Sequence, residues 1–206
     1  MNTQVQHTLR DSAVIRWTAL LLLALAMFCS YIFMDILSPI KDLMLTERGW
    51  DSTAFGTMQG SETFLNVFVF FLIFAGIILD KMGVRFTAVL SGTVMLIGAL
   101  IKYYAISESF MGSGVETWFT ENLNHIPVFE QLGVSPFYEG MPASAKVAAC
   151  GFMIFGCGVE MAGIMASRGI VKWFKGREIA LAMGSEMALA RLGVATCMIF
   201  SPFFAK

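Results

Sequence analysis

Long apolar segments alternate with shorter charged ones along the chain. Each apolar segment is close to the roughly 20 residues that a helix needs to cross about 30 Å of hydrocarbon. Inside lipid the backbone must satisfy its own hydrogen bonds, so the pattern predicts helices that span a membrane. We expect an all-α membrane protein with five transmembrane helices, over residues 17–37, 57–79, 86–104, 147–167 and 179–203.

Composition supports lipid as the main partner of the chain. Hydrophobic residues make up 57% of the sequence and charged residues only 14%, which is unlike a soluble domain. The net charge of −1 gives no reason to expect a nucleic-acid partner. The cysteines lie in apolar segments and the two histidines are isolated, so we expect no disulfide, metal site or cofactor.

Lysine and arginine predict the orientation, because cytoplasmic loops carry an excess of them. The predicted inner segments hold Arg10, Arg16, Lys81, Arg85, Arg168, Lys172, Lys175 and Arg177. The outer side receives Lys41, Arg48, Lys102, Lys146 and Lys206. We therefore expect a cytoplasmic N-terminus, a multi-pass protein of the cell inner membrane, and an extracytoplasmic loop over residues 105–144, which we interpret as a surface cap.

A charged segment, GIILDKMGVRF, separates the second and third predicted spans. Its glycine and charged positions are Gly76, Asp80, Lys81, Gly83 and Arg85. We expect Gly76 to allow close helix contact and Asp80 to suit the start of a helix. The spacing resembles the loop motif G-x-x-x-D-[RK]-x-G-x-[RK] of the major facilitator superfamily. The resemblance implies a secondary transporter in which this loop is a conformational latch; the alternative is a tight cytoplasmic turn.

Charged residues inside the predicted spans carry the functional argument, because each is costly in lipid and normally faces a cavity or a partner. They are Asp35, Glu62, Glu160, Glu186 and Arg191. At about 1.5 Å per residue, Glu160 and Arg191 lie roughly 20 Å and 18 Å into their spans, near the depth at which transporters hold substrate. We take these two as candidate substrate contacts, and the other three as candidate proton-path or gate residues. A structural ion pair is the alternative for Glu160 and Arg191.

Two further segments narrow the resemblance. They are GFMIFGCGVEMAG, residues 151–163, and WFKGREIALAMGSEMALARLG, residues 173–193. Both resemble the branch of the superfamily that includes the lysosomal dipeptide uniporters. The resemblance implies that Glu160 faces the ammonium group of a dipeptide and Arg191 its carboxylate. It also implies an N-terminal half, since the superfamily has twelve helices in two halves, so we expect a C-terminal half as a partner.

Two other functions stay open at this point. In an organic or inorganic anion carrier of the nitrate type, Arg191 alone holds the anion and Glu160 is its structural partner. A non-transporting membrane sensor or scaffold is the alternative from another class, although it has no need for charged residues inside its spans. We do not expect an enzyme, since no nucleophile–base pair or metal ligand set is recognisable in the sequence.

Overall fold

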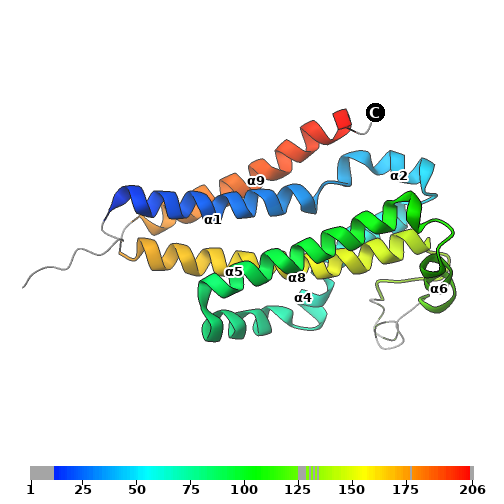
Figure 1. The fold of residues 1–206 in the computed structure, drawn as a ribbon, viewed down its shortest axis with the longest axis horizontal. Coiled ribbons are helices and arrows are strands. Elements are labelled where there is room, and N and C mark those ends of the chain that lie inside the picture. The colour runs from blue at the N-terminus through cyan, green and yellow to red at the C-terminus, as the bar shows by residue number, and fades with distance from the viewer. Residues whose placement is uncertain are drawn as a thin grey trace, which may run out of the picture.

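The computed structural model describes residues 12–124, 129, 131, 133, 135–176 and 178–204. Within these residues the prediction of an all-α protein is confirmed, because they form helices and turns and no strand. Four helices are long and apolar enough to cross a membrane. They are α1 (Ala13–Met34), α5 (Phe71–Ile106), α8 (Ala143–Phe174) and α9 (Ile179–Phe204), and they lie lengthwise in one bundle (Figure 1). A multi-pass membrane protein is consistent with this fold, while the count of five spans stays a prediction.

The second predicted span, residues 57–79, is not one continuous helix. It is divided among α3 (Ser52–Gly60), the 3-10 turn η3 (Ser61–Thr63), α4 (Phe64–Phe68) and the start of α5. Phe70, between α4 and α5, has a left-handed backbone with φ of 55°. The sequence carries no proline or charge run that announces these breaks.

The long helix α5 is two helical segments joined at Gly83. This residue has φ of 82° and ψ of 171°, a backbone conformation that glycine adopts readily and other residues rarely do. Residues 71–82 run toward the end of the bundle where α1 begins, and residues 84–106 run back (Figure 1). We call that end the inner end. The opposite end, which carries α2 (Lys41–Glu47) and α6 (Gly114–Asn122), is the outer end.

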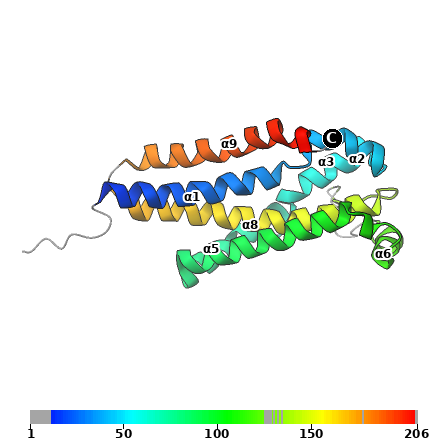
Figure 2. The same cartoon turned by 45° about the horizontal axis from the view of Figure 1, so that its top comes forward.

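The bundle consists of two closely packed helix pairs that meet at α8. In the pair α5–α8, a Cβ added to Gly98 would lie 2.5 Å from the backbone nitrogen of Phe155, so the two helices touch through glycine. In the pair α1–α9, a Cβ on Gly193 would lie 2.4 Å from the carbonyl oxygen of Phe28. Figure 2 shows α9 and α1 running side by side above α8 and α5.

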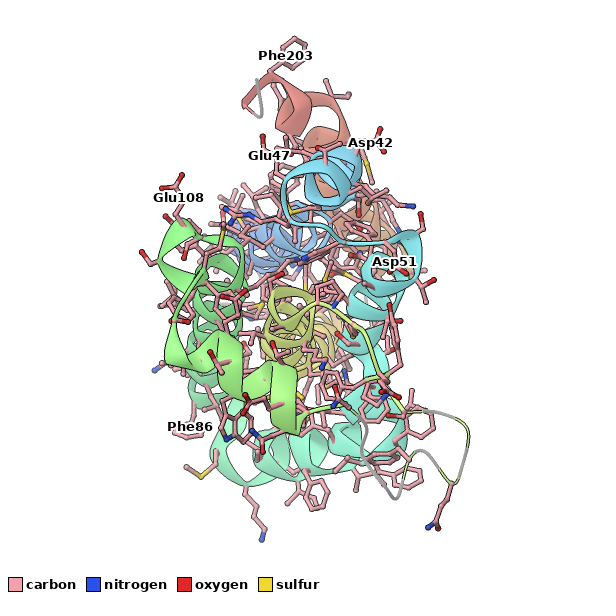
Figure 3. The ribbon with its side chains drawn as sticks, turned by 90° about the vertical axis from the view of Figure 1, so that its right-hand side faces the viewer. Asp42, Glu47, Asp51, Phe86, Glu108 and Phe203 are labelled. Carbon is pink, nitrogen blue, oxygen red and sulfur yellow. The ribbon has the colours of Figure 1, made fainter. Side chains whose placement is uncertain are left out.

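An apolar core closes the outer end of the bundle. The 3-10 turn η4 (Glu108–Phe110) and α6 belong to the segment between α5 and α8, and Phe110 is completely buried in this core. At its edge the Trp50 indole donates to Ser144 Oγ at 2.8 Å, and buried Lys146 donates to Asn124 Oδ1 at 2.9 Å. Figure 3 looks onto this end, with Asp42, Glu47, Asp51 and Glu108 around it.

Candidate functional site

The structure places Glu160 and Arg191 on neighbouring helices at a similar depth. Ala190, next to Arg191, packs with Ala162 and Ala166 of α8 in one buried cluster. Glu160 is half-buried and Arg191 is exposed. Within the described residues, the two side chains form no ion pair with each other. Their helices therefore come together while their charged groups stay separate.

The guanidinium of Arg191 lies over the ring of Tyr31 on α1, with 5.6 Å between the Cζ atom and the ring centroid. A contact with a ring does not neutralise the guanidinium charge, so its N–H groups stay available for a carboxylate. Arg191 is thus held in place by an aromatic contact, and no carboxylate of the described chain neutralises it.

Glu62 lies where the broken second segment crosses α8. A Cβ added to Gly156 would be only 2.1 Å from the carbonyl oxygen of Glu62, so the two backbones are in direct contact. The Glu62 side chain is 5% exposed and interacts electrostatically with Glu160, Asp35 and Lys102. We call Asp35, Glu62 and Glu160 the acidic row.

Asp35 marks the outer end of this row. Its Oδ1 atom accepts hydrogen bonds from Ser38 Oγ at 3.2 Å and from Gln59 Nε2 at 3.1 Å. These bonds tie the end of α1 to α3. A carboxylate in this position is already satisfied by two donors, so Asp35 is better placed to link two helices than to hold a solute.

Lys102 is a member of the site that the sequence analysis missed. We counted it among the outer cations; it lies four residues before the outer end of α5, and its side chain is 5% exposed and buried in the bundle. Its Nζ is 4.0 Å from the centroid of the Phe152 ring and has no hydrogen-bond partner among the described residues. It interacts electrostatically with Asp35 and Glu62. The sequence did carry a signal for this burial. Lys102 lies within the predicted span 86–104 and four residues after Gly98, hence on the same helix face as that glycine.

Glu186 is not brought into the acidic row by any described contact. It is buried on α9, on the same face as the buried residues Ala182 and Ala190. Five residues separate it from Arg191, which places it about 7 Å further toward the inner end. Its role as a proton-path or gate residue stays a prediction.

The loop motif lies at the inner end and forms an ion pair within the chain. Asp80 pairs with Arg168 of α8, and both side chains are largely exposed. The expectation that Asp80 begins a helix is wrong, because it lies in the last turn before the break at Gly83. Gly76 has no atom within 4 Å of an added Cβ, so it makes no close helix contact among the described residues. Lys81 and Arg85 are exposed.

A groove of about 440 Å³ lies beside this ion pair. The groove is lined by four charged side chains and by a glycine: Asp80, Arg168, Lys172, Lys175 and Gly83. The cations outnumber the single acid, so the groove is basic. Among the described residues, no group of three or more histidine, cysteine, aspartate or glutamate side chains is placed to hold a metal ion.

Comparisons with protein families, curated proteins and solved structures found no match to this chain.

Proposed function

We propose that this chain is the N-terminal helical half of a transporter of the major facilitator type, which moves a small zwitterionic solute, such as a dipeptide, across the inner membrane by alternating access. The observation that carries the proposal is the placement of Glu160 and Arg191. A carboxylate and a guanidinium lie at similar depth on adjacent helices. Among the described residues, neither group forms an ion pair. Transporters hold solutes near that depth.

The separation of the two groups is what a zwitterion requires. A dipeptide carries its ammonium and its carboxylate several ångströms apart, so it needs an acid and a base that do not neutralise each other. If Glu160 and Arg191 were a structural pair, they would be in contact. The contact of Arg191 with the Tyr31 ring, rather than with a carboxylate of the described chain, supports a guanidinium that is free to bind a carboxylate ligand.

Glu160→Gln tests the role of the carboxylate. The substitution keeps the size and hydrogen bonding of the side chain and removes its charge. We expect uptake of a free dipeptide to collapse in cells that express the variant together with the C-terminal half, because losing one partner of a buried charge pair costs on the order of 2 to 5 kcal/mol. The control is Glu108→Gln, which removes an exposed carboxylate at the outer end without touching the proposed ammonium site.

Uptake of the N-acetylated dipeptide separates the remaining outcomes. The N-acetylated compound lacks the ammonium, so its weak uptake should be the same in wild type and in Glu160→Gln. If the variant still prefers the free dipeptide as strongly as wild type does, Glu160 is not the ammonium site. If wild type takes up both compounds equally and Arg191→Ala abolishes both, the protein is an anion carrier.

A further inference from the structure

A basic face lies at the inner end of α8. Four residues there follow one another at intervals of three and four, so they lie on one side of the helix: Arg168, Val171, Lys172 and Lys175. The three cations are exposed. All four residues line the groove of about 440 Å³ beside the Asp80–Arg168 pair. The end of α8 therefore supplies one wall of this groove.

The other wall is the turn between the two segments of α5. It consists of Leu79, Asp80, Gly83 and Val84. A Cβ added to Gly83 would meet no atom within 4 Å, so the turn leaves open space at this point. The volume of the groove lies within the range of about 300–1,000 Å³ that small-molecule sites occupy. A ligand of headgroup size can therefore lie between α5 and α8.

The groove carries an excess of positive charge. Asp80 is the one acid among the described residues that line it, and this carboxylate is already paired with Arg168. Lys172 and Lys175 add two further positive charges. The Arg168 side chain is 50% exposed, and its guanidinium has five N–H donors to share between Asp80 and a ligand. These donors suit an anion with several acceptor oxygens, such as a phosphate group.

Apolar side chains in and around the groove favour a lipid phosphate over a soluble one. Leu79, Val84 and Val171 line the groove together with the charged residues. Met82 and Phe86, in the same turn of the chain, are exposed. A water-soluble phosphate gains nothing from this apolar surface, whereas the acyl chains of a lipid would cover it. The groove also lies at the end of helices long enough to cross a membrane, which is the depth of lipid headgroups.

We propose that the groove between the turn at Gly83 and the end of α8 binds the headgroup of an anionic phospholipid. Lys172 and Lys175 bind the phosphate oxygens, Arg168 donates from the edge that faces away from Asp80, and Val171 contacts the start of an acyl chain. Basic pockets between membrane helices bind anionic headgroups in this way. A bound lipid would bridge α5 and α8 at the end of the bundle that has the smaller apolar core.

Thermal unfolding of the purified chain in a nonionic detergent tests the site. Dioleoylphosphatidylglycerol is titrated at constant ionic strength, and dioleoylphosphatidylcholine, which has the same acyl chains and no net charge, is the comparison. We expect the melting midpoint of wild type to rise with the anionic lipid and to saturate, since a ligand that binds only the folded state stabilises it. Phosphatidylcholine should raise it much less. Equal rises with the two lipids would overturn the proposal.

Matched double variants locate the charges that bind the lipid. Lys172→Gln/Lys175→Gln should raise the phosphatidylglycerol concentration at half-saturation at least about tenfold, because two charge-assisted contacts are lost. The control Lys81→Gln/Arg85→Gln removes two exposed cations of the same end that do not line the groove, and it should keep the wild-type value. Lys172→Arg/Lys175→Arg retains both charges and should also keep it. Equal losses in the groove variant and the control, or no loss in the groove variant, would assign the effect to the overall charge of the inner end and overturn the proposal.

Glycerol 3-phosphate separates a lipid from a soluble ligand. It carries a phosphate and a glycerol without acyl chains, so we expect it to leave the melting midpoint unchanged at concentrations at which phosphatidylglycerol saturates. A saturable rise equal to that with the lipid would make the groove a site for a soluble phosphate, against the proposal. No transported solute is present in these measurements, so a failure of dipeptide uptake and a failure of lipid binding are distinguishable.

Discussion

The outer and inner ends of the molecule are built differently. Among the described residues, the apolar core at the outer end and along α8 contains 20 buried residues, whereas the core at the inner end contains four: Leu20, Ile170, Phe174 and Ala182. The outer end adds buried or half-buried polar contacts such as Trp50 to Ser144. The inner end adds an exposed ion pair, Asp80–Arg168, beside an open basic groove.

This difference shows which part of the bundle resists motion. Dense apolar packing holds the helices of the outer end in one arrangement, because separating them opens cavities. An exposed ion pair is worth little and can be exchanged for another at small cost. In the alternating-access cycle proposed above, the inner end would therefore be the part of this chain that changes partners while the outer end stays intact.

Matched phenylalanine substitutions should produce the largest contrast. Phe110 of the outer core and Phe174 of the inner core are both 0% exposed. We expect Phe110→Ala to cost about 3–5 kcal/mol of stability, because its crowded surroundings cannot collapse into the cavity. Phe174→Ala should cost less, since the small inner core relaxes more easily. Thermal unfolding in detergent measures both, and an equal or larger cost at Phe174 would remove the distinction between the ends.

Two glycine substitutions test where the helices are locked together. A Cβ on Gly156 would collide with the Glu62 carbonyl at 2.1 Å, whereas a Cβ on Gly76 meets no atom within 4 Å. We expect Gly156→Ala to destabilise the protein by about 1–3 kcal/mol through this overpacking. Gly76→Ala should be neutral or stabilising, because alanine favours a helix. Equal melting midpoints for the two variants would mean that the contact at Gly156 is not tight.

A pH titration tests a polar contact of the outer end. The Tyr138 hydroxyl donates to Asp51 Oδ1 at 3.1 Å, and burial, followed by this bond to Asp51, raises the pKa of Tyr138 to about 12. Because the folded state favours the neutral phenol, its contribution to stability is complete below pH of about 10 and is lost as pH rises toward 12. Tyr138→Phe should lower the free energy of unfolding by about 1 kcal/mol at neutral pH. It should also remove the fall in stability that ionisation of Tyr138 causes as pH rises toward 12.

The control for that titration is Tyr103→Phe, which removes the hydroxyl of an exposed tyrosine on α5. Unfolding measured across the alkaline range should match wild type in this variant. If Tyr138→Phe loses stability with the same pH dependence as wild type, the bond to Asp51 does not contribute to the outer end.

Asp80→Asn should have the smallest effect on stability, at most about 1 kcal/mol, because its partner Arg168 is exposed. Its effect on function should be larger: if the pair is a conformational latch, uptake slows while membrane insertion stays normal. Asp80→Glu, which keeps the charge, is the matched control and should retain more activity. Normal uptake by Asp80→Asn would reduce the loop motif to a topogenic turn.

The sequence predicted the helical class and most long helices because apolar runs of about 20 residues leave few other structures in lipid. It did not predict the division of residues 57–79, since the sequence there carries no proline or charge run, and η3 and α4 are held by packing against α8. Tertiary contacts of this kind leave no periodic signal in one chain.

The candidate site was only partly visible for the same reason. Glu160 and Arg191 stood out as charges within apolar runs. Lys102 was left out of the candidate site because it lies near the end of its predicted span. Its importance follows from the burial of its Nζ without a hydrogen-bond partner among the described residues, which requires coordinates.

Binding of four forms of one dipeptide to wild-type protein tests the central claim most directly. The forms are the free dipeptide, its N-acetylated derivative, its C-terminal amide, and the doubly blocked compound, each measured by competition with a labelled free dipeptide. If Glu160 and Arg191 hold the two charged ends, blocking either end should weaken binding at least about 30-fold, the equivalent of about 2 kcal/mol. An N-acetylated dipeptide that binds as tightly as the free one would contradict the account.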